Sequence, residues 1–157
     1  MTLHPGIDWL GRLQDTVPQF LRPLEFRPVE TADELLAASH LVYREYLKRR
    51  YVRPNASGLK LSIFHALPTT VTFIALHGRR LIATITAIED SPLGLPMDEA
   101  YKLEVDRLRR SHHRLAEATM LALNTDLFGR GVFTMFHAKK LLLTLGLFRT
   151  MFEYMRS

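Results

Sequence analysis

The sequence predicts an α+β domain with a mainly antiparallel central sheet. Its clearest local signal lies in residues 71–88, where two β-rich runs flank His77, Gly78 and Arg79 in the pattern of a hairpin. Around this hairpin the strand and helix patterns follow in the order β-α-β-β-α-β-α, which suits an α+β fold with an antiparallel centre. A length of 157 residues favours one core. We therefore expect one domain over residues 24–157.

The N-terminal half begins with an amphipathic arm over residues 1–23, in which apolar side chains recur at helical spacing. A short strand is expected over residues 25–29. A helix follows and ends around Arg49, with Thr31 as its N-cap and Glu34 at the capping-box position.

The C-terminal half continues from the hairpin into the connector DSPLGLPM, which is so apolar that we expect it to cover apolar surface. A helix over residues 98–110 follows, with Asp98 as its N-cap. A third long strand is expected at residues 114–123. The final helix, at residues 132–155, is apolar on nearly every side, and such a helix is normally buried or covered.

Composition excludes several classes of protein. The absence of cysteine excludes disulfides, thiolate metal sites and a covalent cysteinyl intermediate. The motifs G-x-S-x-G and H-E-x-x-H, the Walker loop and the usual nucleic-acid modules are also missing. The most apolar continuous segment, Leu141–Phe148, is too short to span a bilayer, and the N-terminal residues do not resemble a signal peptide. We therefore expect a cytoplasmic protein without a metal site.

The formal charge of +5 lies entirely in the C-terminal part, because residues 101–157 hold 10 Lys/Arg and 5 Asp/Glu. An acidic partner is expected there, and four classes fit: a phosphate-bearing ligand, an acidic protein, nucleic acid and a membrane surface. A solvated basic face explains the same charge. The candidate contacts lie on the 98–110 helix and early in the final helix: Lys102, Arg107, Arg109, Arg110, Lys139 and Lys140.

Glu117 is the most informative residue of the third long strand. Strict alternation places it on one face with Leu115, Thr119, Leu121 and Leu123. A carboxylate among leucines is desolvated, which raises its pKa and makes it a candidate general base. A buried acid paired with an arginine explains the pattern equally, and a bulge in the strand changes the face assignment.

The segment LFGRGVF, residues 127–133, places Gly129 and Gly131 just before the final helix. Free backbone N–H groups at such a point bind phosphate, and Arg130 adds positive charge. An ordinary turn is the more frequent explanation of two glycines.

Four stretches together resemble the N-acyl amino acid synthase family, which is related to the acyl-homoserine-lactone autoinducer synthases within the GNAT acyltransferase fold. They are LVYREYLKRRYV (41–52), TTVTFIALHGRRLIATITAIEDSPLGLPMDEAY (69–101), EVDRLRR (104–110) and RLAEATMLAL (114–123). The resemblance covers about residues 25–156.

The resemblance implies transfer of a long-chain fatty acyl group from an acyl-carrier-protein or coenzyme A thioester to an amine, often that of an amino acid. It implies no permanently bound cofactor, and the acyl-phosphopantetheine thioester would be a co-substrate. In this fold the third long strand splays from its neighbour and the pantetheine arm lies in the opening, which here implies contacts with Ala118, Met120, Leu121, Gly129, Arg130 and Gly131. Glu117 matches the acid proposed as base in the relatives, and the backbone near Ala118 and Thr119 would stabilise the oxyanion.

The resemblance also implies an acidic acyl carrier protein as partner, steered by the basic residues of the C-terminal part. The apolar connector and final helix would then wall a tunnel for the acyl chain. A membrane surface and a second copy of the chain stay open as further partners.

Two departures from the family stand out. Members tend to have glycine before the tyrosine of the RY step, where this chain has Arg50 before Tyr51. The family also continues through further strands after the final helix, so we expect the C-terminal strands of the GNAT fold to be absent from this chain or supplied by a partner. A non-catalytic module that binds acyl groups or carrier proteins and a GNAT enzyme using acetyl-coenzyme A are the alternative functions.

Overall fold

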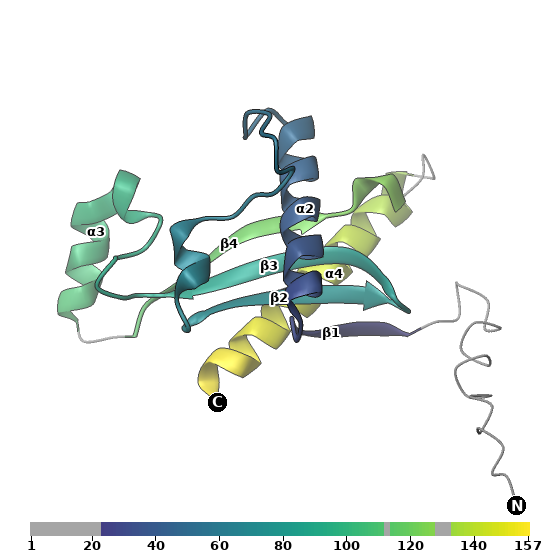
Figure 1. The fold of residues 1–157 in the computed structure, drawn as a ribbon. Coiled ribbons are helices and arrows are strands. Elements are labelled where there is room, and N and C mark those ends of the chain that lie inside the picture. Colours follow the sequence, from purple (N-terminus) through teal and green to yellow (C-terminus); the bar gives the residue numbers. More distant parts are fainter. Residues whose placement is uncertain (1–22, 112–113, 128–132) are drawn as a thin grey trace, which may run out of the picture.

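The computed structural model describes residues 23–111, 114–127 and 133–157, and its elements follow in the predicted order (Figure 1). The predicted arm, residues 1–23, lies outside the described residues except for Pro23. The elements are β1 (Leu24–Pro28), α2 (Ala32–Lys48), β2 (Thr70–His77), β3 (Arg80–Glu89), α3 (Asp98–Arg110), β4 (Ala116–Leu123) and α4 (Phe133–Arg156), with two short 3-10 helices, η2 (Ile63–Ala66) and η3 (Thr125–Leu127).

The four strands form one antiparallel sheet in the order β1-β2-β3-β4, as an α+β fold with an antiparallel centre requires. The predicted hairpin is present, since His77 pairs with Arg80 across a turn in which Gly78 has a φ of 62°. Within the described residues β4 pairs only with β3, so its other edge is free.

Two helices cover opposite faces of the sheet (Figure 1). α4 packs with Leu143, Leu147 and Met151 against β2 and β3, where Phe73 and Ile85 are fully buried. On the other face α2 packs Leu41 and Val42 against Met120 and Ala122 of β4, and a third cluster holds Ile88, Leu95 and Val105. The apolar connector therefore covers the sheet through Leu95.

The two predicted helix starts have different outcomes. Thr31 caps α2 as predicted, because its hydroxyl accepts the N–H of Glu34 at 3.2 Å. The prediction for α3 is wrong, since the N-cap position is Met97. Asp98 is the first helical residue, and its carboxylate instead accepts the N–H of Leu95 at 2.7 Å.

A bulge in β4 changes the predicted face assignment. Thr119 pairs with Thr86 but Ala122 pairs with Thr84, so β4 contains one residue more than β3 in this interval, and Met120 there has a φ of 53°. The paired residues on β3 show that Glu117 and Thr119 lie on the α2 face of the sheet. Leu121 and Leu123 contact the α4 cluster on the opposite face instead.

α4 leaves much of its apolar surface uncovered by the described residues. Five large side chains are between 46% and 60% exposed: Leu141, Leu142, Leu145, Phe152 and Tyr154. Among the described helices, none combines the length and the hydropathy that crossing a bilayer demands.

Candidate active site

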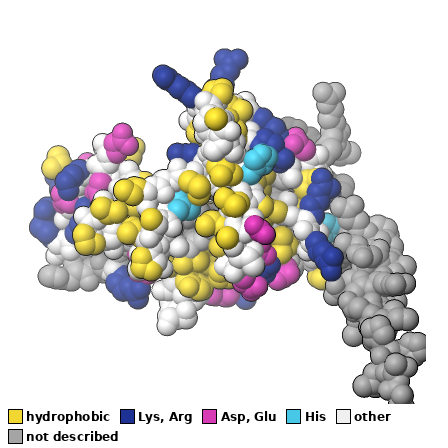
Figure 2. Space-filling view, viewed as in Figure 1, with side chains coloured by type: hydrophobic (Ala, Val, Ile, Leu, Met, Phe, Trp, Pro, Cys, Tyr) yellow, Lys and Arg dark blue, Asp and Glu magenta, His cyan; other side chains and the backbone are white. Residues whose placement is uncertain are grey.

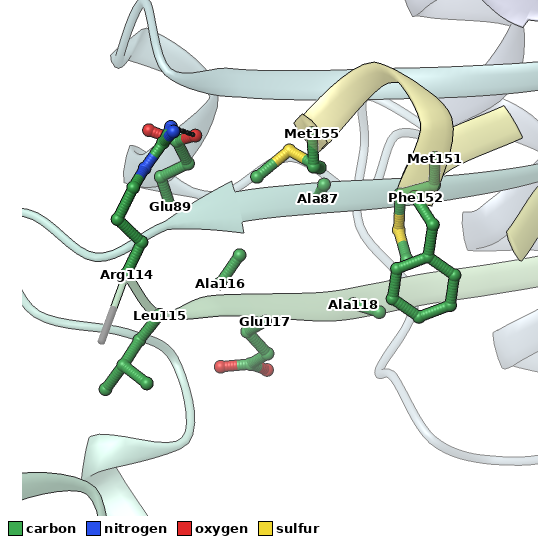
Figure 3. Close-up of a pocket in the computed structure, with 10 residues that line it drawn as sticks. All are labelled: Ala87, Glu89, Arg114, Leu115, Ala116, Glu117, Ala118, Met151, Phe152 and Met155. Atoms are coloured by element: carbon green, nitrogen blue, oxygen red, sulfur yellow. Dashed lines mark hydrogen bonds and ion pairs between the residues drawn. The ribbon is translucent and has the colours of Figure 1, made fainter. Parts of the chain in front are cut away.

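A cavity of about 390 Å³ lies where the first half of β4 passes the C-terminal turns of α4 (Figure 3). Ala116 and Ala118 pair with Glu89 and Ala87 of β3 and share the α4 face with them. These alanines leave room beneath the helix. The lining is completed by Arg114, Leu115, Glu117, Met151, Phe152 and Met155.

The walls of this cavity are apolar, and charged groups lie at its rim. Arg114 donates to Glu89 at 2.8 Å, an ion pair at the end of the cavity where β3 finishes and β4 begins. Of the two elements expected to wall an acyl tunnel, α4 lines this cavity and the connector does not. No residue of the connector lines this cavity, because Leu95 packs against Ile88 and Val105 instead.

Glu117 belongs to the same stretch of β4 but points to the other side of the strand. Its partner on β3 is Ile88, and Figure 3 shows its carboxylate directed away from Met155 and Phe152. The side chain is partly buried, and Oε2 accepts the N–H of Met97 at 2.7 Å. Within the described residues no group donates to Oε1, so one oxygen is fixed and the other has a free acceptor site.

The backbone of β4 offers donors along its free edge. Asp90 donates its N–H to the carbonyl of Leu115 at 2.9 Å, which makes these two residues a hydrogen-bonded pair. Alternation along an antiparallel ladder then turns the N–H groups of Ala116 and Ala118 away from β3 and toward the free edge. An N–H at this edge, close to a carboxylate and an apolar cavity, is suited to hold a carbonyl oxygen.

The other predicted contacts of β4 are divided between the two faces. Thr119 is partly buried on the side of Glu117, whereas Leu121 is turned toward α4. Met120 is buried against Leu41 and Val42, which leaves only its backbone available to a ligand. The predicted phosphate loop, Gly129, Arg130 and Gly131, lies outside the described residues.

Comparison with known proteins identifies the family. Residues 37–156 match the model of the family "N-acyl amino acid synthase FeeM". The chain belongs to this family. It is similar to the solved structure of FeeM, an N-acyl amino acid synthase from uncultured soil microbes, with 26% sequence identity and a TM-score of 0.61 over 82% of this chain and 67% of that one. No curated protein matches the chain significantly. The resemblance seen in the sequence is thereby confirmed.

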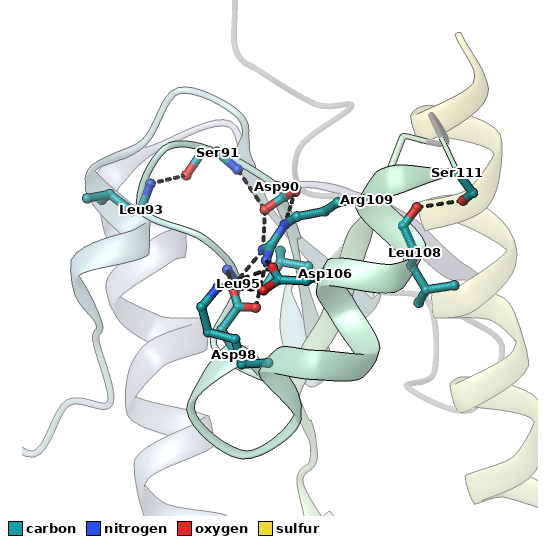
Figure 4. A network of polar contacts seen from close by, with 10 residues as sticks. Asp90, Ser91, Leu93, Leu95, Asp98, Asp106, Leu108, Arg109 and Ser111 are labelled. Atoms are coloured by element: carbon teal, nitrogen blue, oxygen red, sulfur yellow. Dashed lines mark hydrogen bonds and ion pairs between the residues drawn. The ribbon is translucent and has the colours of Figure 1, made fainter.

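One arginine of this FeeM-family chain, Arg109, fixes the connector to α3 (Figure 4). Arg109 donates to Asp90 at 2.7 Å, to Asp98 at 2.6 Å and to Asp106 at 2.8 Å. Hydrogen bonds from Arg109 lower the pKa of Asp98 to about 2, and those to Asp90 and Asp98 raise the pKa of Arg109 itself. The cluster joins Asp90, the first residue of the connector, to α3, and Asp98 accepts the Leu95 N–H near the other end. These contacts hold the Met97 N–H against the carboxylate of Glu117.

This cluster corrects the predicted role of Arg109, because a guanidinium engaged by three carboxylates is not presented to a partner. Lys102 also forms an ion pair, with Asp106 at 3.0 Å, but remains 64% exposed. Arg107, Arg110 and Lys139 are exposed, and Lys140 is partly buried. The sequence contained no sign that residues 90, 98, 106 and 109 converge.

Proposed function

We propose that the protein transfers a long-chain fatty acyl group from an acyl-carrier-protein or coenzyme A thioester to the amine of an amino acid or a similar acceptor. The observation that carries this proposal is the arrangement around β4, in which a carboxylate and an apolar cavity lie on opposite sides of one strand with a free edge. Family membership supports the reaction class. We further propose that the sheet is the core of a GNAT-type acyltransferase fold.

The reaction needs no covalent enzyme intermediate. In the proposed path the acyl chain occupies the cavity and the thioester carbonyl oxygen accepts the Ala118 N–H at the strand edge. The ammonium of the acceptor gives a proton to Oε1 of Glu117, and the amine nitrogen then attacks the thioester carbon. The tetrahedral oxyanion collapses, the C–S bond breaks, and the leaving thiolate takes up the second proton that the former amine nitrogen loses as the amide forms.

The walls of the cavity favour a fatty chain over an acetyl group. Alanine, methionine and phenylalanine side chains offer apolar contact along the α4 face, and each methylene buried there contributes about 0.8 kcal/mol. An acetyl donor would leave most of this surface unused. A module that binds acyl groups without turnover remains a distinct outcome of the test below.

The test is acyl transfer by the purified protein, with dodecanoyl to octadecanoyl donors on carrier protein or coenzyme A and a panel of amino acids. Products are measured by mass spectrometry. Glu117→Gln should lower the rate by about 100-fold or more, because the amide cannot accept the proton. The control is Glu30→Gln, an exposed carboxylate outside the cavity, which should change the rate little.

Three results would contradict the proposal. Unchanged turnover in Glu117→Gln would remove Glu117 as the base. Tight acyl or carrier binding without product from the wild type would favour the non-catalytic module. Turnover with acetyl-coenzyme A and none with long-chain donors would favour the small-acyl enzyme.

A further inference from the structure

The last turn of α2 and the residues after it form a dense group of basic side chains, which we call the α2 basic end. Lys48, Arg49, Arg50 and Arg53 are exposed there, and Arg44 is partly exposed one turn earlier. In Figure 2 several Lys and Arg side chains project from the end of α2. This surface is separate from the basic residues of α3 and α4 considered above.

Only part of this charge is neutralised within the protein. Glu45, fully buried, accepts hydrogen bonds from Lys48 at 2.9 Å and from Thr125 at 2.8 Å. Burial alone raises the pKa of Glu45, but these bonds outweigh it and hold the pKa below its ordinary value. Asp126 takes a second bond from Lys48 at 2.7 Å. Among the described residues no carboxylate pairs with Arg50 or Arg53, so a net positive surface remains.

Arg50 also has an unfavourable backbone conformation. It follows the C-cap of α2 with a φ of 62°, in the left-handed region. Glycine is the usual residue at such a helix end, because any Cβ crowds the following carbonyl there. An arginine held in a conformation that favours glycine is the kind of outlier that accompanies a functional surface.

The α2 basic end lies close to the downstream end of β4. Leu41 and Val42 pack over the bulge of β4, and the last turn of α2 then reaches η3 through the Glu45–Thr125 and Lys48–Asp126 contacts. Figure 1 shows this end of α2 extending beyond β4. From the end of β4 back to Glu117 the strand spans about 20 Å, a distance on the scale of an extended phosphopantetheine arm.

We propose that the α2 basic end is the docking surface for an acidic acyl carrier protein, placed so that the arm of the carrier enters along the free edge of β4 from its downstream end. This inference rests on the proposed function, whose donor it specifies. Charge complementarity selects the partner, because carrier proteins are small and strongly acidic. α3 lies at the opposite end of the sheet, beside the start of β4, so its exposed Arg107 and Arg110 form the rival surface.

The test compares the wild-type protein with a double variant, Arg50→Glu with Arg53→Glu, using hexadecanoyl carrier protein and the matching acyl-pantetheine as donors. For the carrier-bound donor kcat/KM should fall about tenfold or more, while for acyl-pantetheine it should stay close to wild type. Arg79→Gln with Arg80→Gln, two exposed arginines of the β2–β3 turn, is the matched control. An equal loss with both donors would overturn the docking role.

Direct binding separates this inference from the proposed function. The affinity for the purified carrier is measured by titration at two salt concentrations, and it should weaken in the double variant and with added salt even if no product forms. Arg50→Gly should raise the melting temperature and yet weaken carrier binding. Unchanged carrier binding in these variants would overturn the inference, as would loss confined to Arg107→Glu with Arg110→Glu. Binding of RNA or anionic vesicles in place of the carrier would also overturn it.

Discussion

The bulge at Met120 can be tested by comparing two truncations at one position. Met120 is 8% exposed and packs against Leu41 and Val42, so replacing it by alanine should cost about 2–5 kcal/mol of unfolding free energy. Alanine would still have to adopt the φ of 53°, which costs an L-residue about 1–2 kcal/mol. Glycine avoids this cost but loses about 0.5–1 kcal/mol through its greater backbone freedom. Met120→Gly should therefore be more stable than Met120→Ala by about 0.5–1 kcal/mol.

The assay is urea unfolding of both variants, with Ala122→Gly as control. Ala122 is buried in the same strand at a regular position, where glycine should be less stable than alanine by about 1 kcal/mol. The expected order at position 120 is thus the reverse of the order at position 122. If glycine is the less stable residue at both positions, the strand has no left-handed residue. The separation of Glu117 from Leu121 onto opposite faces is then wrong.

Three further predictions concern stability. Arg109→Gln should destabilise the protein at neutral pH, whereas Arg107→Gln, on the exposed face of the same helix, should not. The pKa of Asp98 is about 2 in the folded protein, so the stability that its ionised form contributes is complete above the ordinary pKa of 3.8 and is lost as pH falls toward 2. Urea unfolding at pH 7 and pH 3 should therefore show a smaller difference between wild type and Arg109→Gln in acid, and a larger one would contradict the reasoning. Glu45→Ala should cost about 3 kcal/mol, since it leaves cations without their buried partner, and a loss below about 0.5 kcal/mol in the same assay would contradict the contacts described. Gly146→Ala should lower the melting temperature although alanine has the better helix propensity, because the added methyl group would overlap the ring of Phe26, which β1 packs against α4. A raised melting temperature would show that this packing is loose.

The elements and their order could be predicted from the sequence because they depend on local patterns. The 71–88 hairpin follows from its two β-rich runs and Gly78, and α2 follows from helical spacing and the Thr31 cap. The bulge could not be predicted in the same way, since the residue with positive φ is a methionine and nothing in AEATMLAL interrupts the alternation.

The parts of the site that sequence reasoning missed depend on contacts between distant residues. Asp98 has a good N-cap residue type, but its carboxylate is drawn to the Leu95 N–H and to Arg109 instead. The contact between Glu117 and the Met97 N–H joins residues twenty positions apart. Such contacts appear only once the chain has folded. What the sequence could provide was the residue type, an acid in a strand of apolar neighbours.

The central claim is that an acyl thioester lies along the free edge of β4 with its carbonyl oxygen at the Ala118 N–H. The most direct measurement is amide hydrogen exchange, followed by NMR, with and without a hexadecanoyl-pantetheine analogue in which the thioester sulfur is replaced by methylene. The account predicts that the ligand slows exchange at the Ala118 N–H. The N–H of Glu117 points toward β3 in the antiparallel ladder, so it should be protected from exchange in both samples. Fast exchange at Ala118 in the ligand-bound protein, with protection appearing at another element, would contradict it.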